Sequence, residues 1–230
     1  MFTKKEITNE ILSKSKKGFT LAEVLITLSI LGVVAAITIP SAINNGTRKT
    51  TIVKVKKMYS TLEHALGILT VENNNDSINI DDYPYTEAGA IKMYNDFIKP
   101  YVKINTDAGT TKAKKEKIMS CGKIKLLSGS EHNTDHCDST KYYGVQLKDG
   151  STLILRGNPK QDDNNQLYFE LDVNGKQGPN TLGKDVFTFF ISPANPRNLS
   201  DPSVSSCTTE GAGWGCSTYI IRNNNMNYLD

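Results

Sequence analysis

One carboxylate stands at the start of the longest uncharged stretch of this sequence. Glu23 follows the basic pair Lys16-Lys17, and no charged residue occurs between Val24 and Thr47. A carboxylate within a membrane helix costs about 2.5–3.5 kcal/mol on insertion scales. We therefore expect that Glu23 serves a function and that it needs a cationic partner to offset this cost.

A second group of polar residues lies in the loop that begins at Asp172. Asn174 and Gly175 follow, and Asp185 lies further along the same loop. Oxygen-bearing side chains that alternate near a glycine are typical of loops that bind a hard cation such as calcium. The loop is not an EF-hand, because no glutamate closes it at the twelfth position. The alternative interpretation is a tight Asn-Gly turn between two strands.

The four cysteines fall into two local pairs, Cys121 with Cys137 and Cys207 with Cys216. Four cysteines allow three connectivities, and in an exported domain the two local pairs are the simplest choice. Each bond would stabilise the fold by about 2–3 kcal/mol. His132 and His136 could complete a zinc site with two of these thiols, but there is no CxxC motif, and a thiolate site competes with disulfide formation.

Composition limits the classes of protein to consider. The chain has 230 residues, of which 38% are hydrophobic and 22% charged, so it is neither a disordered tail nor a polytopic membrane protein. The net charge of +3 comes from residues 1–18, so the body has no basic excess and no nucleic-acid partner is predicted. We find no nucleophile–base pair, phosphate loop or metal triad in the sequence and expect no enzyme.

The first element that must position these residues is the uncharged stretch. As a helix, residues 24–47 would rise about 36 Å, enough to cross a bilayer core of about 30 Å. One alternative is a secretory signal peptide cut near Ala36 or Ala42, and another is an uncleaved signal anchor. The carboxylate near the start of the run argues against both.

The segment from Lys16 to Val24, KKGFTLAEV, closely resembles the processing site of type IV prepilins and type II secretion pseudopilins. The resemblance implies that a prepilin peptidase cuts between Gly18 and Phe19 and N-methylates the new terminal Phe19. It also implies that Glu23 neutralises the terminal amine of a neighbouring subunit in a filament.

The same resemblance implies a domain organisation. Gly32 and Pro40 match the glycine that loosens the helix and the proline that kinks it in this family, and we assign both, with Glu23, to assembly. The expected parts are a leader at 1–18, a transmembrane and polymerisation helix at 19–43, the outer half of that helix at 44–72 and a globular pilin-like domain at 73–230.

The function implied is that of a structural subunit of a type IV pilus-like or type II secretion pseudopilus filament. Its partners would be other pilin subunits, the prepilin peptidase, an inner-membrane assembly platform and, before assembly, membrane lipid. It would span the bacterial inner membrane once, with its body outside the cytoplasm, and then enter the filament. A minor pilin that acts as a binding, adhesion or DNA-uptake module at the filament tip is the alternative. No cofactor is certain, although some major pseudopilins hold calcium in a loop that the stretch from Asp172 to Asp185 loosely resembles.

The helix is expected to continue beyond the membrane. Apolar residues recur at steps of three and four on one stripe: Ile52, Val55, Tyr59, Leu62, Leu66 and Leu69. Such a stripe covers a sheet in its own domain more often than it forms a coiled-coil seam. A loop is predicted at 72–82, a short helix at 86–99 and an exposed connection at 103–116.

The second half of the chain is strand-like. Residues 142–147 and 152–156 flank Lys148-Asp149-Gly150, which is a strong hairpin signal. Further strands are predicted at 166–173 and 186–191, with an edge strand at 218–221. Together with the resemblance, these elements predict an α+β fold in which a long N-terminal helix packs on a C-terminal antiparallel sheet.

Overall fold

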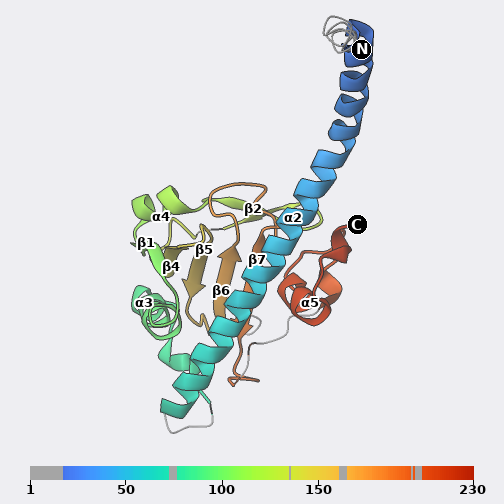
Figure 1. Cartoon of the computed structure of the whole chain (residues 1–230). Helices are drawn as coiled ribbons and strands as arrows, with labels where there is room; N and C mark the ends of the chain where they lie inside the picture. Colours follow the sequence, from blue (N-terminus) through green and yellow to red (C-terminus); the bar gives the residue numbers. More distant parts are fainter. Residues whose placement is uncertain (1–17, 73–76, 135, 161–164, 198, 200–203) are drawn as a thin grey trace, which may run out of the picture. The chain divides into compact units, whose positions relative to one another are not determined.

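The structure is a computed structural model that describes residues 18–72, 77–134, 136–160, 165–197, 199 and 204–230 (Figure 1). Residues 1–17 of the expected leader lie outside the described residues. The chain divides into two compact units, residues 1–47 and residues 48–230. One α-helix, α2 (Leu21–Glu72), has 52 residues and includes Pro40. Its part from Arg48 onward belongs to the second unit.

Five antiparallel strands form the main sheet of the second unit, in the order β1-β4-β5-β6-β7 (Figure 1). They are β1 (Ile104–Gly109), β4 (Tyr142–Leu147), β5 (Thr152–Arg156), β6 (Leu167–Asp172) and β7 (Val186–Ile191). The strands predicted at 142–147, 152–156, 166–173 and 186–191 are confirmed. Gly150 in the turn between β4 and β5 has a φ of 84°, a conformation that glycine adopts without strain.

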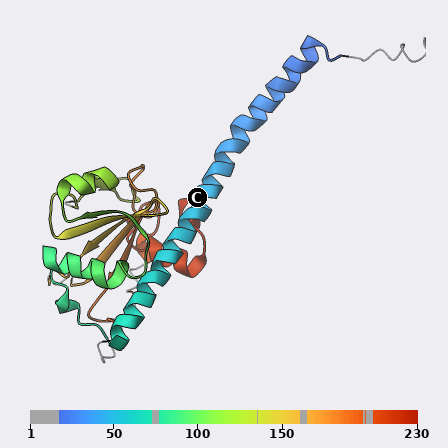
Figure 2. The ribbon, with the colours of Figure 1, turned by 60° about the vertical axis from the view of Figure 1, so that its left-hand side comes forward.

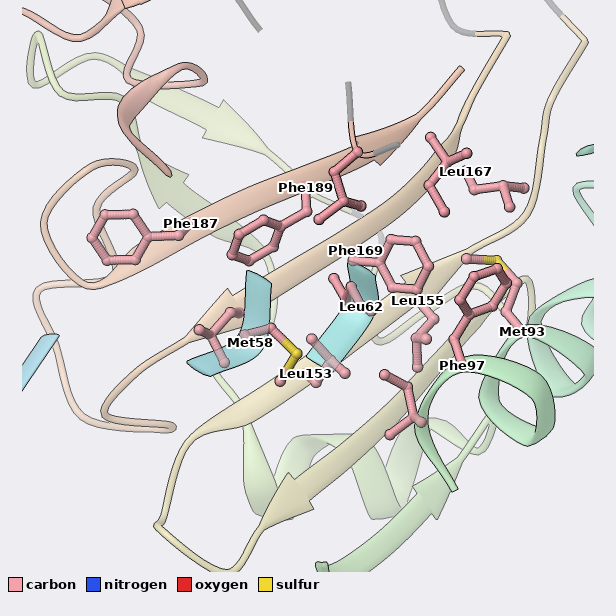
Figure 3. Packing of buried hydrophobic residues seen from close by; sticks show 14 of the residues in the cluster. Met58, Leu62, Met93, Phe97, Leu153, Leu155, Leu167, Phe169, Phe187 and Phe189 are labelled. Carbon is pink, nitrogen blue, oxygen red and sulfur yellow. The ribbon is translucent and has the colours of Figure 1, made fainter. Parts of the chain in front are cut away.

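Residues 48–72 of α2 cover one face of this sheet (Figure 3). In the predicted stripe, Val55, Leu62 and Leu66 are fully buried. They belong to one core with side chains from alternate positions of the strands: Leu153, Leu155, Phe169, Phe187 and Phe189. The stripe therefore covers a sheet in its own domain and is not a coiled-coil seam. The α+β arrangement expected from the sequence is confirmed.

A second helical segment contributes to the same core, and Figure 2 shows it beside the sheet. α3 (Glu87–Met93) continues into a π-helical turn, η2 (Tyr94–Ile98), as predicted for residues 86–99. Thr86 caps its start, because the Thr86 hydroxyl accepts the backbone N–H of Gly89 at 3.1 Å. The ring of Phe97 packs edge-on against Phe169 with 5.3 Å between centroids.

The opposite face of the sheet is covered by a segment that was predicted to be an exposed connection. Residues 103–116 are mostly exposed, as predicted, but they contain β1 and most of α4 (Lys112–Ile118), so the expectation of a mere connection is wrong. Ile118 and Met119 are buried together with Tyr142 and Ile154. A small second sheet pairs β2 (Lys123–Lys125) with β3 (Glu131–Asn133).

Lys115 shows why α4 could not be predicted from the local sequence. Its side chain is fully buried, and Nζ donates to the backbone carbonyls of His136 at 2.6 Å, Ser139 at 2.7 Å and Tyr142 at 3.2 Å. A buried ammonium group is tolerated when hydrogen bonds replace its hydration. A run rich in lysine usually indicates a solvent-exposed segment, and the tertiary contacts that reverse this cannot be seen in the local sequence.

The edge strand predicted at 218–221 is also wrong, because this segment is a helix, α5 (Cys216–Asn223). Thr218, Ile220 and Ile221 are β-branched, which favours a strand when each residue is considered by itself. Cys216, Ser217 and Ile220 are buried at helical spacing, and that packing decides the conformation. Asn224 ends the helix in the left-handed conformation.

Short turns complete the second unit. Of the loop predicted at 72–82, residues 73–76 lie outside the described residues, and the rest contains a 3₁₀ turn, η1 (Ile80–Asp82). Ile78 and Ile80 are buried there, so this part of the predicted loop contributes to the core. Two further 3₁₀ turns are η4 (Val204–Ser206) and η5 (Asn227–Leu229).

Candidate functional site

The first turn of α2 begins with a reciprocal cap between Thr20 and Glu23. The Thr20 hydroxyl accepts the backbone N–H of Glu23 at 3.2 Å, and Oε2 of Glu23 accepts the N–H of Thr20 at 2.8 Å and its hydroxyl at 2.9 Å. This is a capping box, which satisfies donors that the start of a helix leaves unpaired. Sequence analysis missed Thr20, although Thr-Leu-Ala-Glu before an apolar run is the signature of such a cap.

Oε1 of Glu23 takes no part in this cap. No described residue donates a hydrogen bond to Oε1, and the Glu23 side chain is exposed. The predicted cleavage site immediately precedes the cap: Phe19 is 87% exposed, and no atom lies within 4 Å of where a Cβ on Gly18 would be. The residues predicted to be cut, methylated and paired therefore lie within six consecutive exposed positions, from Gly18 to Glu23.

The residues that follow the cap form an exposed apolar surface. Among the described residues, α2 is the one helix long and apolar enough to cross a bilayer, and none of its most apolar stretch is buried by protein. The core helix of a soluble domain would bury such a stretch. More than half of each side chain is exposed at several large apolar residues: Leu21, Leu25, Ile26, Leu28, Ile30 and Leu31.

Polar side chains within this stretch bond to their own helix. The hydroxyls of Thr27, Ser29 and Thr38 donate to backbone carbonyls three or four residues earlier, at 2.8–2.9 Å. In lipid a hydroxyl must be satisfied internally, so these contacts suit a membrane helix. Gly32 has no atom within 4 Å of its missing Cβ, and Pro40 lies inside the helix. Their roles in assembly stay predictions.

In the second unit, the loop between β6 and β7 brings Asp172, Asn174 and Asp185 together. The backbone N–H of Asn174 donates to Oδ1 of Asp172 at 3.1 Å, and its side-chain Nδ2 donates to Oδ2 of Asp185 at 3.3 Å. Asp185 also accepts the backbone N–H groups of Asn180 at 2.8 Å and of Thr181 at 2.7 Å. Both aspartates are buried.

Two amide oxygens in this loop have no hydrogen-bond donor among the described groups. The Oδ1 atoms of Asn174 and Asn180 are buried, and no described group donates to them. Burial, followed by the charge of Asp185, raises the pKa of Asp172 to about 8, and burial raises the pKa of Asp185 as well. Carboxylate and amide oxygens are the ligands that calcium takes in proteins, so the residues present fit a hard cation. No cluster of three His, Cys, Asp or Glu side chains suited to a metal occurs among the described residues, so the amides would be needed.

The cysteines are bonded as two local pairs, Cys121 with Cys137 and Cys207 with Cys216. These are the pairs that the sequence order favours. The zinc site considered above does not form from the described residues, because two of its thiols are joined and its histidines have other neighbours. The ring of His132 meets Trp214 edge-on with 5.5 Å between centroids, while Nδ1 of His136 lies 3.3 Å from Oε1 of Glu170.

A buried polar cluster beside His136 was missed by sequence analysis. Glu170 is buried, and its Oε2 accepts a hydrogen bond from the hydroxyl of Tyr168. Burial by itself would raise the pKa of Glu170, but His136 and the Tyr168 hydroxyl outweigh it and hold the pKa below the usual value. Alternate polar residues on a strand usually indicate a solvent-facing side, whereas here α4 and the segment after it cover that side. We assign this cluster to the structure of the body.

Comparison with known proteins identifies the N-terminal region. Residues 13–39 match the family described as the prokaryotic N-terminal methylation motif, which is the signature of type IV prepilins and pseudopilins. The chain therefore carries a prepilin-type processing and methylation motif. Proteins with this motif are structural subunits that assemble with other pilin subunits and are processed by a prepilin peptidase. No curated protein and no solved structure matches the chain.

Proposed function

We propose that this chain is a structural subunit of a type IV pilus-like filament or a type II secretion pseudopilus. It is cut after Gly18, methylated at Phe19, held in the inner membrane by residues 19–43 and assembled through that helix, with its body outside the cytoplasm. The observation that carries this proposal is the capping box of Thr20 and Glu23 at the start of an exposed apolar helix, inside the matched motif.

The cap suggests how Glu23 acts in assembly. Cleavage leaves a cationic α-amine on Phe19, one residue before Thr20. Because Thr20 engages Oε2 of Glu23, Oε1 can accept the amine of a neighbouring subunit while the cap stays closed. This pairing removes two uncompensated charges from an apolar bundle, and a neighbour shifted along the axis would leave both charges unpaired. Glu23 would thereby set the axial register of the filament.

Mass spectrometry of the full chain produced together with a prepilin peptidase tests the processing step. We expect a mature protein that begins at N-methyl-Phe19, and we expect the Gly18→Val variant to stay uncut. A Cβ at this position would meet no atom within 4 Å beyond the neighbouring residues, so we expect the variant to change what the peptidase recognises and not the fold. Gly32→Ala, which also meets no atom within 4 Å, is the matched control and should be processed normally. A mature terminus near Ile37 or Ile43 would point to an ordinary signal peptidase and contradict the proposal.

A minor subunit at the filament tip is the second candidate function, and the loop closed by Cys207 and Cys216 favours it. The tip of this loop is exposed, with three polar residues in sequence: Thr208, Thr209 and Glu210. Backbone bonds from Leu127 and Ser128 to the carbonyls of residues 212 and 211 hold the loop in place. A rigid exposed loop suits contact with a partner. The abundance of the chain in sheared filaments separates the two functions, because a major subunit dominates them and a tip subunit is scarce.

We also propose that Asp172, Asn174 and Asp185 bind calcium, with Asn180 as a further oxygen ligand. When bound, the ion would supply the positive charge that offsets the two buried aspartates. The residues themselves fix the connection between β6 and β7, since Asp185 already holds the backbone of residues 180 and 181. The unpartnered oxygens of Asn174 and Asn180 support this proposal.

A further inference from the structure

Lysine residues gather at one end of the second unit. This is the end at which β4 turns into β5 and at which β6 leaves the sheet, and it lies against the start of this unit's part of α2. Nζ of Lys54 donates to the backbone carbonyls of Asp149 at 3.0 Å and Val173 at 2.6 Å. We call this end the basic rim and define it by ten residues: Arg48, Lys49, Lys54, Lys57, Lys103, Lys117, Lys125, Lys148, Lys176 and Lys184.

Contacts between loops place these lysines at one end of the unit. The backbone N–H of Lys148 donates to the carbonyl of Lys103 at 3.1 Å, so the start of β1 lies beside the turn between β4 and β5. The loop after β6 lies against the same turn, because a Cβ on Gly175 would come within 2.8 Å of the carbonyl oxygen of Gly150. Lys176 follows directly in that loop.

The remaining segments join the rim through the same loop. Nζ of Lys176 donates to the carbonyl of Glu116 at 2.8 Å, next to Lys117 at the end of α4. The backbone N–H of Lys125 donates to the carbonyl of Asn180 at 2.9 Å.

Residues at the C-terminus contact two further segments of the rim. The Tyr228 hydroxyl donates to the carbonyl of Gly183 at 2.7 Å, next to Lys184, and Asp230 pairs with Arg48 at 2.6 Å.

The rim has more positive charge than its carboxylates neutralise. Asp172 and Asp185 are buried, while Asp149 is engaged by Lys57 and Asp230 by Arg48. Four rim lysines are exposed and form no ion pair with a carboxylate that the structure describes: Lys103, Lys117, Lys148 and Lys184. Lys125 lies opposite Glu131 in the pairing of β2 with β3, and the pKa of that carboxylate is lowered by Lys123 and, to a lesser degree, by Lys125.

Lysines at the opposite end of the unit are partnered. Lys92 pairs with Asp96, Lys160 pairs with Asp81 at 3.2 Å, and Nζ of Lys141 lies 4.4 Å from the ring centroid of Tyr85. These three partnered lysines therefore provide an internal comparison for the rim.

We propose that the basic rim binds the anionic head groups of the bilayer while the subunit waits in the membrane. This inference rests on the proposed membrane anchorage, because the chain passes directly from the last residue of the uncharged stretch, Thr47, to Arg48 in the rim. Lysines next to a membrane segment are attracted to anionic lipid, and the attraction is screened beyond about 10 Å at ordinary salt. Entry into the filament then exchanges contacts with lipid for contacts with other subunits, so the charge of the lipid controls how readily a subunit leaves the membrane.

Lysine acylation of the full mature chain in lipid nanodiscs tests this inference. The chain is placed at one copy per disc, either in phosphatidylcholine or in a mixture of phosphatidylcholine with phosphatidylglycerol. The lysines are then acylated with an uncharged reagent, and mass spectrometry measures the rate of acylation at each lysine. We expect Lys148, Lys176 and Lys184 to react about fivefold more slowly in the anionic discs than in the phosphatidylcholine discs. The attraction of one lysine to an anionic surface is about 1 kcal/mol, which corresponds to about a fivefold change in affinity. Lys92, Lys141 and Lys160 should react at the same rate in both discs, and high salt should abolish the protection.

A pair of variants with equal charge isolates the rim. Replacing Lys148, Lys176 and Lys184 by Gln should also remove the protection of Lys103 and Lys125. The control variant, with Gln at positions 92, 141 and 160, should retain it.

Three outcomes would overturn the inference. Equal reactivity of the rim lysines in both kinds of disc would contradict lipid binding by the rim but not the proposed membrane anchorage. A chain that fails to enter any disc would contradict the proposed anchorage as well. Protection in phosphatidylcholine that requires two copies per disc would assign the rim to an acidic surface of another subunit.

Discussion

Two ionisable side chains in this protein occupy positions where an unsatisfied charge is costly, and each is satisfied in a different way. Glu23 is held by its own helix start and keeps one carboxylate oxygen available. Lys115 is fully buried, and its ammonium group donates hydrogen bonds to three backbone carbonyls of one short segment, residues 136–142. The first arrangement leaves capacity for a partner outside the chain, while the second fastens a covering segment to the sheet.

Variants at residues 20 and 23 separate the cap from the charge. Glu23→Gln retains an oxygen that can accept from Thr20 but loses the negative charge, whereas Thr20→Val loses the hydroxyl and keeps the charge. We expect the Glu23→Gln variant to be inserted and processed normally. Its amount in sheared filaments should fall about tenfold, because a charged hydrogen bond is stronger than a neutral one by about 1.4 kcal/mol. Thr20→Val should assemble better than Glu23→Gln. Immunoblots of membranes and filaments give both amounts, and equal incorporation of Glu23→Gln and wild type would rule out the charge pairing.

Lys115→Met should destabilise the body by about 2–4 kcal/mol, because it leaves two buried carbonyls and a partly buried one without their donor. Lys114→Met, which changes the exposed neighbouring lysine in the same helix, should stay within about 0.5 kcal/mol of wild type. Denaturant titration of the full chain in detergent gives both values, with fluorescence of the single tryptophan, Trp214, as the signal. Equal stabilities for the two variants would show that the three hydrogen bonds contribute nothing measurable.

Among the elements, those with a regular hydrophobic period could be predicted from the sequence and those decided by long-range contacts could not. The stripe through Val55, Leu62 and Leu66, and the strands on either side of Gly150, have the bounds that the pattern indicates. α4 was concealed by its lysines and α5 by its β-branched residues, since in both cases burial from distant segments overrides local preference. The polar face of β6 was unpredictable for the same reason: Glu170 is buried beneath a segment more than thirty residues away in sequence, at His136.

The loop between β6 and β7 should respond to calcium. If Asp172 and Asp185 bind the ion in the folded state only, calcium at 100 times its dissociation constant stabilises the fold by about 2.7 kcal/mol. We expect millimolar calcium to raise the melting temperature of the full chain in detergent relative to chelator. The double variant Asp172→Asn with Asp185→Asn should lose the increase.

The control for calcium uses another pair of aspartates. Asp81→Asn with Asp82→Asn removes the same formal charge from two exposed positions in a different loop and should retain the increase. If the wild-type chain melts at the same temperature in calcium and in chelator, the loop is only a turn.

For the molecule as a whole, the sequence predicts the parts that have a local signature. It does not predict helices such as α4 and α5, whose conformation depends on packing against distant segments. The methylation motif and the apolar run are contiguous in residues 13–39, so one short segment carries the whole prepilin-type signature. The body has no such segment, because its core joins residues from Val55 to Met226 that meet only after folding. Sequence therefore predicts how this chain is processed better than it predicts what its body contacts.

The division of the chain at residue 47 has a consequence for genetics. The buried core of the body lies entirely beyond Arg48, so substitutions in residues 19–43 leave that core intact. Under the proposed function, we expect such alleles to yield folded subunits that still enter the membrane and compete with wild type for the assembly machinery. In a partial diploid they should therefore be dominant. Alleles that disrupt the core, such as a polar residue at Leu62 or Phe169, yield chains that proteases remove, and these should be recessive. A dominance map of the gene would then change sharply near codon 48.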